Sequence, residues 1–246
     1  MTTLQHFLAT TTPFDLALLA FAALVMPAMS ILAGRQLSRA EKGSLVPRYI
    51  FTMARGLGAA AVLLIGWYWL KRPFAALGLD IPVGFRGQIG FAVDAVLVAV
   101  FAFNVSRVGR LSGEALQRTR RAVGQVKILP RTAGELAAFL AVALNAGFWE
   151  ELFYRGFLIW LFTPVLGVIG AVALSSALFG IGHAYQGWRG VLMTGVVGLV
   201  FAVAYVLTNS LWWLMLAHAL IDFQGGIAGF WLQKKLARSP SPEAVG

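Results

Sequence analysis

The sequence predicts an all-α integral membrane protein, a polytopic bundle of about seven transmembrane helices. Apolar residues make up 59% of the 246-residue chain and charged residues only 12%, whereas soluble proteins average about 45–50% and about 25%. Several apolar runs reach the roughly 20 residues that a helix needs to cross a bilayer. Basic residues gather between these runs, as they do in loops that flank membrane spans. These observations predict one membrane domain.

Seven apolar runs are predicted to form the spanning helices. They are Asp15 to Gly34, Tyr49 to Leu70, Ile89 to Val105, Glu135 to Phe162, Leu166 to Ala184, Trp188 to Leu207 and Leu211 to Leu232. The fourth run is long for one crossing. Because glycine lowers helix preference, this run could break near Gly147 or Gly156 and add an eighth, partial helix.

The positions of the basic residues predict the topology. Alternating the spans puts most of them on one side: Arg35, Arg39, Lys42, Arg48, Arg107, Arg110, Arg118, Arg120, Arg121, Lys127, Arg131, Arg189, Lys234, Lys235 and Arg238. Lys71, Arg72 and Arg86 fall on the other. The positive-inside rule then places the amino terminus outside and the carboxyl terminus in the cytoplasm. The net charge of +10 is expected to meet membrane lipids rather than nucleic acid.

The chain contains no cysteine. This excludes disulfides, thiolate metal sites, a cysteine nucleophile and lipidation on cysteine within the sequence.

Three charges interrupt the fourth span, in the stretch FWEELFYRGFL. A charge at the bilayer centre costs about 2.5–3.5 kcal/mol, so Glu150, Glu151 and Arg155 must face protein or water. Glu151 and Arg155 are four residues apart and can pair on one helix face, whereas Glu150 points about 100° away from Glu151. Either Glu150 is free for chemistry, or all three residues form a structural polar contact between helices.

Two of the three histidines lie in later spans and favour the chemical interpretation. His183 lies four residues after Phe179, and His218 lies four residues before Asp222, so each pair shares a helix face. A carboxylate can act as general base, one histidine can assist it, and a second histidine with an acidic neighbour can stabilise an oxyanion. This set predicts hydrolysis.

A metal site is the alternative use of the same residues. Glu150, His183, His218 and Asp222 could bind zinc, or iron at a facial site. No HExxH pair makes that assignment specific. We favour a route without a cofactor, in which Glu150 and His183 hold and deprotonate water, and we keep zinc as the alternative.

Two further charges lie in the predicted spans. Asp94 in the third span is a candidate partner for Arg55 in the second, and a position near water is the alternative. We do not expect catalysis there.

Three motifs lie in order along the chain: EExxxR at Glu150, Glu151 and Arg155, FxxxH at Phe179 and His183, and HxxxD at His218 and Asp222. Together they resemble the CPBP family of intramembrane proteases, also called the CAAX protease or Abi family, which includes Rce1-type endopeptidases. The resemblance covers about Glu135 to Gln233. It divides the chain into N-terminal transmembrane helices with a basic cytoplasmic loop (1–134), catalytic helices (135–233) and a disordered tail (234–246).

The resemblance also implies roles for the motif residues. Glu150 would activate water with His183, and His218 with the residue at 222 would stabilise the oxyanion. Glu151, Arg155 and Phe179 complete the motifs. The family often has Asn where this chain has Asp222. Because an ionised aspartate cannot donate to an oxyanion, Asp222 must be protonated, orient His218 or bind metal.

The function implied is an intramembrane endopeptidase. It would hydrolyse a peptide bond in a membrane-associated or lipid-anchored protein or peptide, as in CAAX processing, and lie in the cytoplasmic membrane of a prokaryote. One alternative is a non-enzymatic membrane immunity or scaffold protein of the same family. The other is a proton-coupled transporter, which the lack of a convincing internal repeat disfavours.

Overall fold

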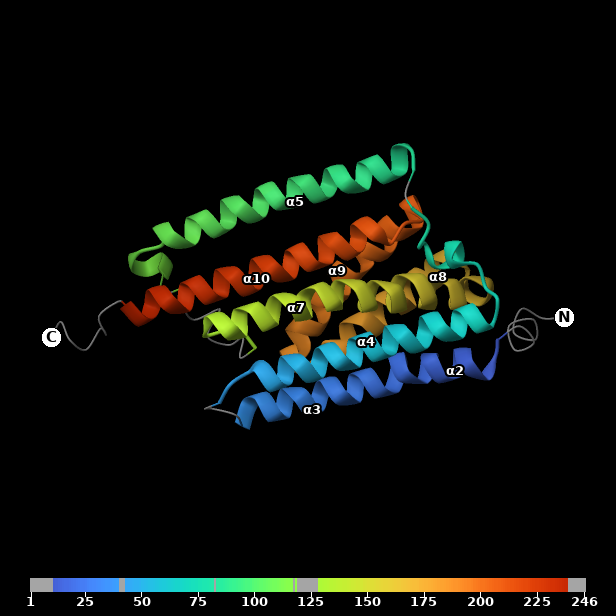
Figure 1. The fold of residues 1–246 in the computed structure, drawn as a ribbon, viewed down its shortest axis with the longest axis horizontal. Helices are drawn as coiled ribbons and strands as arrows, with labels where there is room; N and C mark the ends of the chain where they lie inside the picture. The colour runs from blue at the N-terminus through green and yellow to red at the C-terminus, as the bar shows by residue number, and fades with distance from the viewer. Residues whose placement is uncertain (1–10, 40–42, 82, 117, 119–127, 239–246) are drawn as a thin grey trace.

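The computed structural model describes residues 11–39, 43–81, 83–116, 118 and 128–238, in which every regular element is a helix (Figure 1). The elements are α2 (Pro13–Ala20), η1 (Phe21–Val25), α3 (Met26–Arg39), α4 (Val46–Trp69), η2 (Phe74–Leu77), α5 (Phe85–Arg110), α7 (Ala133–Glu150), η3 (Glu151–Leu158), α8 (Ile159–Gly182), η4 (Ala184–Gln186), α9 (Gly187–Thr208) and α10 (Trp212–Arg238). The predicted all-α fold is confirmed.

Five helical stretches are long and apolar enough to cross a membrane: 13–36, 46–69, 85–108, 133–182 and 184–208. The first joins α2, η1 and α3 without interruption, and the fourth holds both the fourth and the fifth predicted spans. The seventh predicted span corresponds to α10, which is less apolar because it carries polar residues such as His218 and Asp222. It packs against α5 and α7.

The long fourth span does not break where the sequence suggested. It continues as a helix through Gly147 and Gly156, and the backbone leaves helical geometry only at Gly167, with φ 66° and ψ 173°. Gly147 serves close packing instead, since a Cβ there would lie 2.5 Å from the carbonyl oxygen of Met215 on α10. The expected eighth, partial helix is absent from the described part of the chain.

Helix α7 lies between α4 and α10 and is tied to α4 at its start. The Thr132 side chain caps α7 by accepting from the Glu135 backbone N–H. The Glu135 carboxylate in turn accepts from the backbone N–H groups of Leu45, at 2.9 Å, and Arg131, at 2.8 Å. These bonds satisfy donors at the beginning of both helices. They fix the position of the helix that carries Glu150.

The opposite end of the bundle holds a buried ion pair. Arg72, just after α4, donates to both carboxylate oxygens of Asp15 on α2, at 2.6 and 2.7 Å. Its guanidinium also lies 5.0 Å from the ring centroid of Trp67 and 4.7 Å from that of Trp160. Bidentate geometry makes this one of the stronger kinds of ion pair. It joins the first, second and fourth spans.

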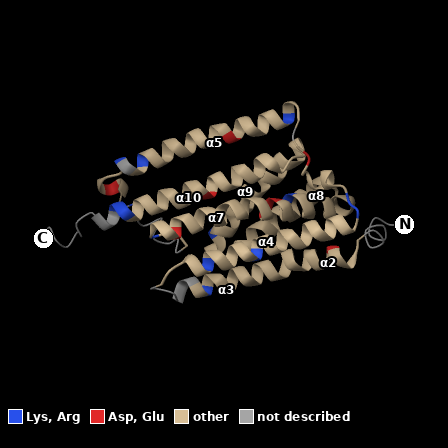
Figure 2. Cartoon of the chain, viewed as in Figure 1, with Lys and Arg blue, Asp and Glu red and all other residues tan. Residues whose placement is uncertain are grey.

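Most basic residues outside the core of the bundle lie near its two ends (Figure 2). The end of α3, the start of α4, and the ends of α5 and α10 lie at one end, whereas Arg72, just after α4, and Arg86, in the first turn of α5, lie at the other. Helix α2 begins at this second end and α10 finishes at the first (Figure 1). The arrangement agrees with an odd number of crossings. Lys42, Arg120, Arg121 and Lys127 lie outside the described residues.

Helix α10 extends to Arg238, past residue 234, where the tail was expected to begin. Residues 239–246 lie outside the described part of the chain.

Candidate active site

A cavity of about 800 Å³ lies inside the bundle and is lined by α3, α4, α7, η3, α8, α9 and α10. Glu150, His183, His218 and Asp222 all line it. They come from three helical segments that are far apart in the sequence, the end of α7, the end of α8 and the middle of α10. The structure therefore brings all four candidate residues together.

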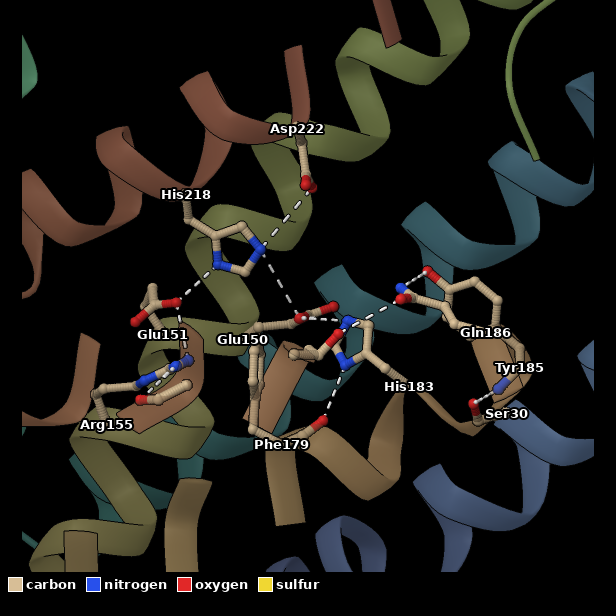
Figure 3. A network of polar contacts seen from close by, with 12 residues as sticks. Ser30, Glu150, Glu151, Arg155, Phe179, His183, Tyr185, Gln186, His218 and Asp222 are labelled. Carbon is tan, nitrogen blue, oxygen red and sulfur yellow. Dashed lines mark hydrogen bonds and ion pairs between the residues drawn. The ribbon is translucent and has the colours of Figure 1, made fainter. Parts of the chain in front are cut away.

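The first motif lies where α7 becomes a π-helix, η3 (Glu151–Leu158), in which all eight residues are buried. Its wider turn changes the backbone pairing, and the Ser175 hydroxyl on α8 donates to the Tyr154 carbonyl at 2.5 Å. Such π segments are rare and often mark functional sites. Here the transition directs Glu150 into the cavity while Glu151 points towards α10 (Figure 3).

Glu151 holds two partners through one oxygen. Its Oε1 accepts from Arg155 Nη1 at 2.9 Å and from His218 Nδ1 at 2.7 Å, and Figure 3 shows it between them. Arg155 also donates to the Gly198 carbonyl at 3.1 Å. The predicted Glu151–Arg155 pair is confirmed. The bond to His218 was not predicted, because it links residues 67 positions apart.

The Phe179 ring packs against both Arg155 and His183. Its ring centroid lies 4.2 Å from the Arg155 guanidinium carbon and 4.7 Å from the His183 ring centroid. The attraction between a cation and an aromatic face is stronger when the pair is shielded from water. The Phe179 carbonyl also accepts from His183 Nδ1 at 2.8 Å. Spacing alone predicted that Phe179 and His183 share a face, and the structure adds this backbone bond.

The segment after His183 is held against α3. The Tyr185 backbone N–H donates to the Ser30 hydroxyl at 3.0 Å, as Figure 3 shows. A Cβ on Gly34 would lie 3.1 Å from the Tyr185 Cα, so the two backbones approach closely. No motif in the sequence pointed to Ser30 or Gly34 as supports of the site.

Both histidines present Nε2 to the same carboxylate oxygen. The other ring nitrogen, Nδ1, is hydrogen-bonded to the Phe179 carbonyl in His183 and to the Glu151 carboxylate in His218. Glu150 Oε2 lies 3.7 Å from His183 Nε2 and 4.0 Å from His218 Nε2. This oxygen is buried and makes no hydrogen bond with the described residues. The separations exceed a direct hydrogen bond but suit groups that act on one small molecule between them.

Asp222 lies at the edge of this group. Its Oδ2 is 3.8 Å from His218 Nε2, beyond hydrogen-bond distance, and its side chain is 38% exposed. One role considered for Asp222 was to orient His218. In the structure, Glu151 holds the His218 ring through its hydrogen bond to Nδ1. Asp222 instead faces the cavity beside the second ring nitrogen.

A metal is the alternative use of the four candidate residues. Among the described residues, no three His, Asp or Glu side chains are grouped closely enough to hold a metal ion. We therefore derive no step through a metal.

The expected pair between Asp94 and Arg55 is not formed. Asp94 on α5 is 3% exposed, and neither carboxylate oxygen has a hydrogen-bond partner in the described part of the chain. Arg55 instead lines the cavity from α4. The sequence could not exclude the pair, because helix positions do not show which spans are neighbours.

Residues 132–224 match the family model described as type II CAAX prenyl endopeptidase Rce1-like. The matched segment contains all three motifs. It begins three residues before the expected limit at Glu135 and ends nine residues before the expected limit at Gln233. No curated protein and no solved structure matches the chain.

Proposed function

Because residues 132–224 match the Rce1-like family model of CAAX proteases, we propose that the chain is an intramembrane endopeptidase that uses Glu150 and His183 to activate water. The observation that carries the proposal is that Glu150 Oε2, His183 Nε2 and His218 Nε2 lie close together in a largely apolar cavity.

In the proposed reaction, water binds between Glu150 and His183. Glu150 removes a proton from the water as its oxygen forms a bond to the scissile carbonyl carbon. The proton then passes from Glu150 to the leaving nitrogen as the C–N bond breaks. His183 can accept from the water through Nε2, because its Nδ1–H is directed to the Phe179 carbonyl.

His218 is suited to stabilise the oxyanion. The Glu151 carboxylate at Nδ1 fixes the ring and can compensate a positive charge on it, so that Nε2–H donates towards the developing negative charge. A protonated Asp222 could supply a second donor from the cavity edge. Glu151 thus acts through His218 rather than on the substrate.

The cavity also supports a lipid-anchored or membrane-associated substrate. Its wall is largely apolar and runs from the site residues to Gln36 and Arg48, near the end of the bundle with most basic residues. By the positive-inside rule this end faces the cytoplasm. We propose that the substrate enters there, with its lipid or apolar side chains along the cavity.

The test compares membranes that contain wild-type protein with membranes that contain Glu150→Gln, by terminal proteomics and then with purified substrate. Removing the general base should lower the cleavage rate by about 10²–10⁴-fold, and His183→Ala should have a loss of similar size. Glu114→Gln is the matched control, because the Glu114 side chain is 79% exposed.

The same assay is run with a metal chelator, which should leave the rate unchanged. A rate lost to the chelator and restored by zinc would overturn the mechanism without metal. If Glu150→Gln cleaved at the wild-type rate, the proposed mechanism would be wrong. If the wild-type chain cleaved no protein and Glu150→Gln kept its partner interaction, the chain would be an immunity or scaffold protein instead.

A further inference from the structure

Arg55 is a cavity-lining cation that the proposed chemistry does not use. It lies on α4, half-buried, and its guanidinium carbon is 6.0 Å from the ring centroid of Trp149. Its Nε is buried without a hydrogen-bond partner, and the guanidinium makes no ion pair within 4.0 Å among the described residues. Glu150 is within electrostatic range but does not contact it.

An arginine in this position needs an anion. Its side chain stays charged in proteins, and placing such a charge in an apolar site without a hydrogen-bonded partner is costly. The other two arginines inside the bundle described above, Arg72 and Arg155, have carboxylate partners at 2.6 and 2.9 Å. Arg55 lacks one, and its planar fork matches a carboxylate through two parallel hydrogen bonds.

The depth of Arg55 favours a peptide carboxylate over a lipid headgroup. Arg55 lies nine residues after the first residue of α4, Val46, which is about 14 Å along the helix. A headgroup at the end of the bundle would meet Arg48 first, since that residue lies at the start of α4 and lines the same cavity. A substrate that reaches Glu150 instead occupies the cavity that Arg55 also lines.

The proposed substrate class carries the required anion. A CAAX sequence is the carboxyl terminus of its protein, so the free α-carboxylate follows the prenylated cysteine by three residues. Cleavage at Glu150 leaves this short segment, with its charged end, within the cavity. Three extended residues span about 10 Å, so the terminal carboxylate stays close to the site.

We propose that Arg55 binds the C-terminal carboxylate of the substrate and makes the protein selective for peptides that end shortly after the scissile bond. This inference rests on the proposed endopeptidase function. It assigns specificity to a helix outside the segment that matches the family. Peptide bonds far from a chain end would be poor substrates, because they would leave Arg55 without a partner.

The competing role for Arg55 is electrostatic support of Glu150. In that role Arg55 would affect every substrate equally, whatever its chain end. A peptide pair that differs only at the terminus separates the two roles.

The experiment uses the purified full chain in detergent and two S-farnesyl peptides of one sequence, one ending in a free carboxylate and the other in a carboxamide. Binding is measured by fluorescence anisotropy, and cleavage by mass spectrometry. A charge-assisted bidentate contact should make the carboxylate peptide bind about 10-fold or more tightly. Arg55→Gln should remove this preference, and Arg55→Lys should restore part of it. Arg48→Gln, the matched control on the same cavity wall, should retain it.

Equal binding of the two peptides by the wild-type chain would overturn the role of Arg55, even if both were cleaved and the endopeptidase function stood. A preference that persists in Arg55→Gln, or that disappears equally in Arg48→Gln, would also overturn it. A preference lost only in Arg55→Gln supports the inference even if neither peptide is cleaved, in which case the proposed cleavage fails by itself. The wild-type comparison needs no variant to fold.

Discussion

Glu151 is the residue on which the polar network depends. One oxygen of its side chain contacts both Arg155 and His218, and the side chains of Glu151 and Arg155 are 0% and 1% exposed. Removing one member of such a pair leaves an unpaired charge in an apolar surrounding. The first motif therefore contains a structural carboxylate, Glu151, beside Glu150, the proposed general base.

We expect strong coupling between Glu151 and Arg155 in a double-mutant cycle. Glu151→Gln and Arg155→Gln should each lower the free energy of unfolding by about 3–5 kcal/mol. The loss of unfolding free energy in the double variant should be smaller than the sum of the two single losses, and the difference should be about 0.5–3 kcal/mol. Denaturant titration in detergent measures this. Glu114 and Arg118 offer a matched pair with the same spacing and exposed side chains, for which the coupling should be close to zero. Additive losses at Glu151 and Arg155 would contradict the structure.

At the scale of single elements, the sequence predicted most helices but not their local geometry. Hydrophobic runs and charge placement located the spans, and i, i+4 spacing predicted which motif residues share a face. The π-helix at Glu151–Leu158 was missed, because the apolar spacing of eight residues does not distinguish a π-helical turn from an α-helical one. A break was considered possible at Gly147 or Gly156, but both glycines serve close contacts and stay helical, and the backbone leaves helical geometry at Gly167.

The close contact between α8 and α9 can be tested at Gly180. A Cβ there would lie 2.7 Å from the Val191 carbonyl oxygen, so Gly180→Ala must separate the two helices. We expect a loss of about 1–3 kcal/mol in the free energy of unfolding, together with lower cleavage, because His183 ends the same helix. Gly58→Ala is the matched control, since nothing lies within 4 Å of its Cβ position on α4. It should be neutral or slightly stabilising in thermal melts. Equal effects of the two variants would argue against the close approach.

At the scale of the whole molecule, the active site needs more of the chain than its motifs suggest. The sequence assigned the first 130 residues only a number of spans and basic loops. In the structure α3 and α4 form part of the cavity wall, through residues such as Met29, Thr52 and Arg55. This could not be predicted, because spans without motif residues carry no signal of which face meets the site.

The absence of cysteine from the sequence makes the orientation directly testable. Arg86 and Arg110 are exposed near opposite ends of α5, so single variants Arg86→Cys and Arg110→Cys report on the two sides of the membrane. A membrane-impermeant maleimide should label Arg86→Cys in intact cells, and Arg110→Cys only after the membrane is opened. The parent chain should remain unlabelled. The reverse pattern would invert the predicted topology.

The shared oxygen of Glu151 also bears on how the protein is made. Arg155 follows Glu151 by four residues, so the pair can form as soon as this segment becomes helical during translation. His218 is synthesised much later, on the last helix. A nascent chain can therefore enter the membrane with Glu151 and Arg155 already paired but with the second histidine missing. On the proposed mechanism, cleavage cannot begin until α10 has been synthesised, so a shorter nascent chain cannot act as a premature protease.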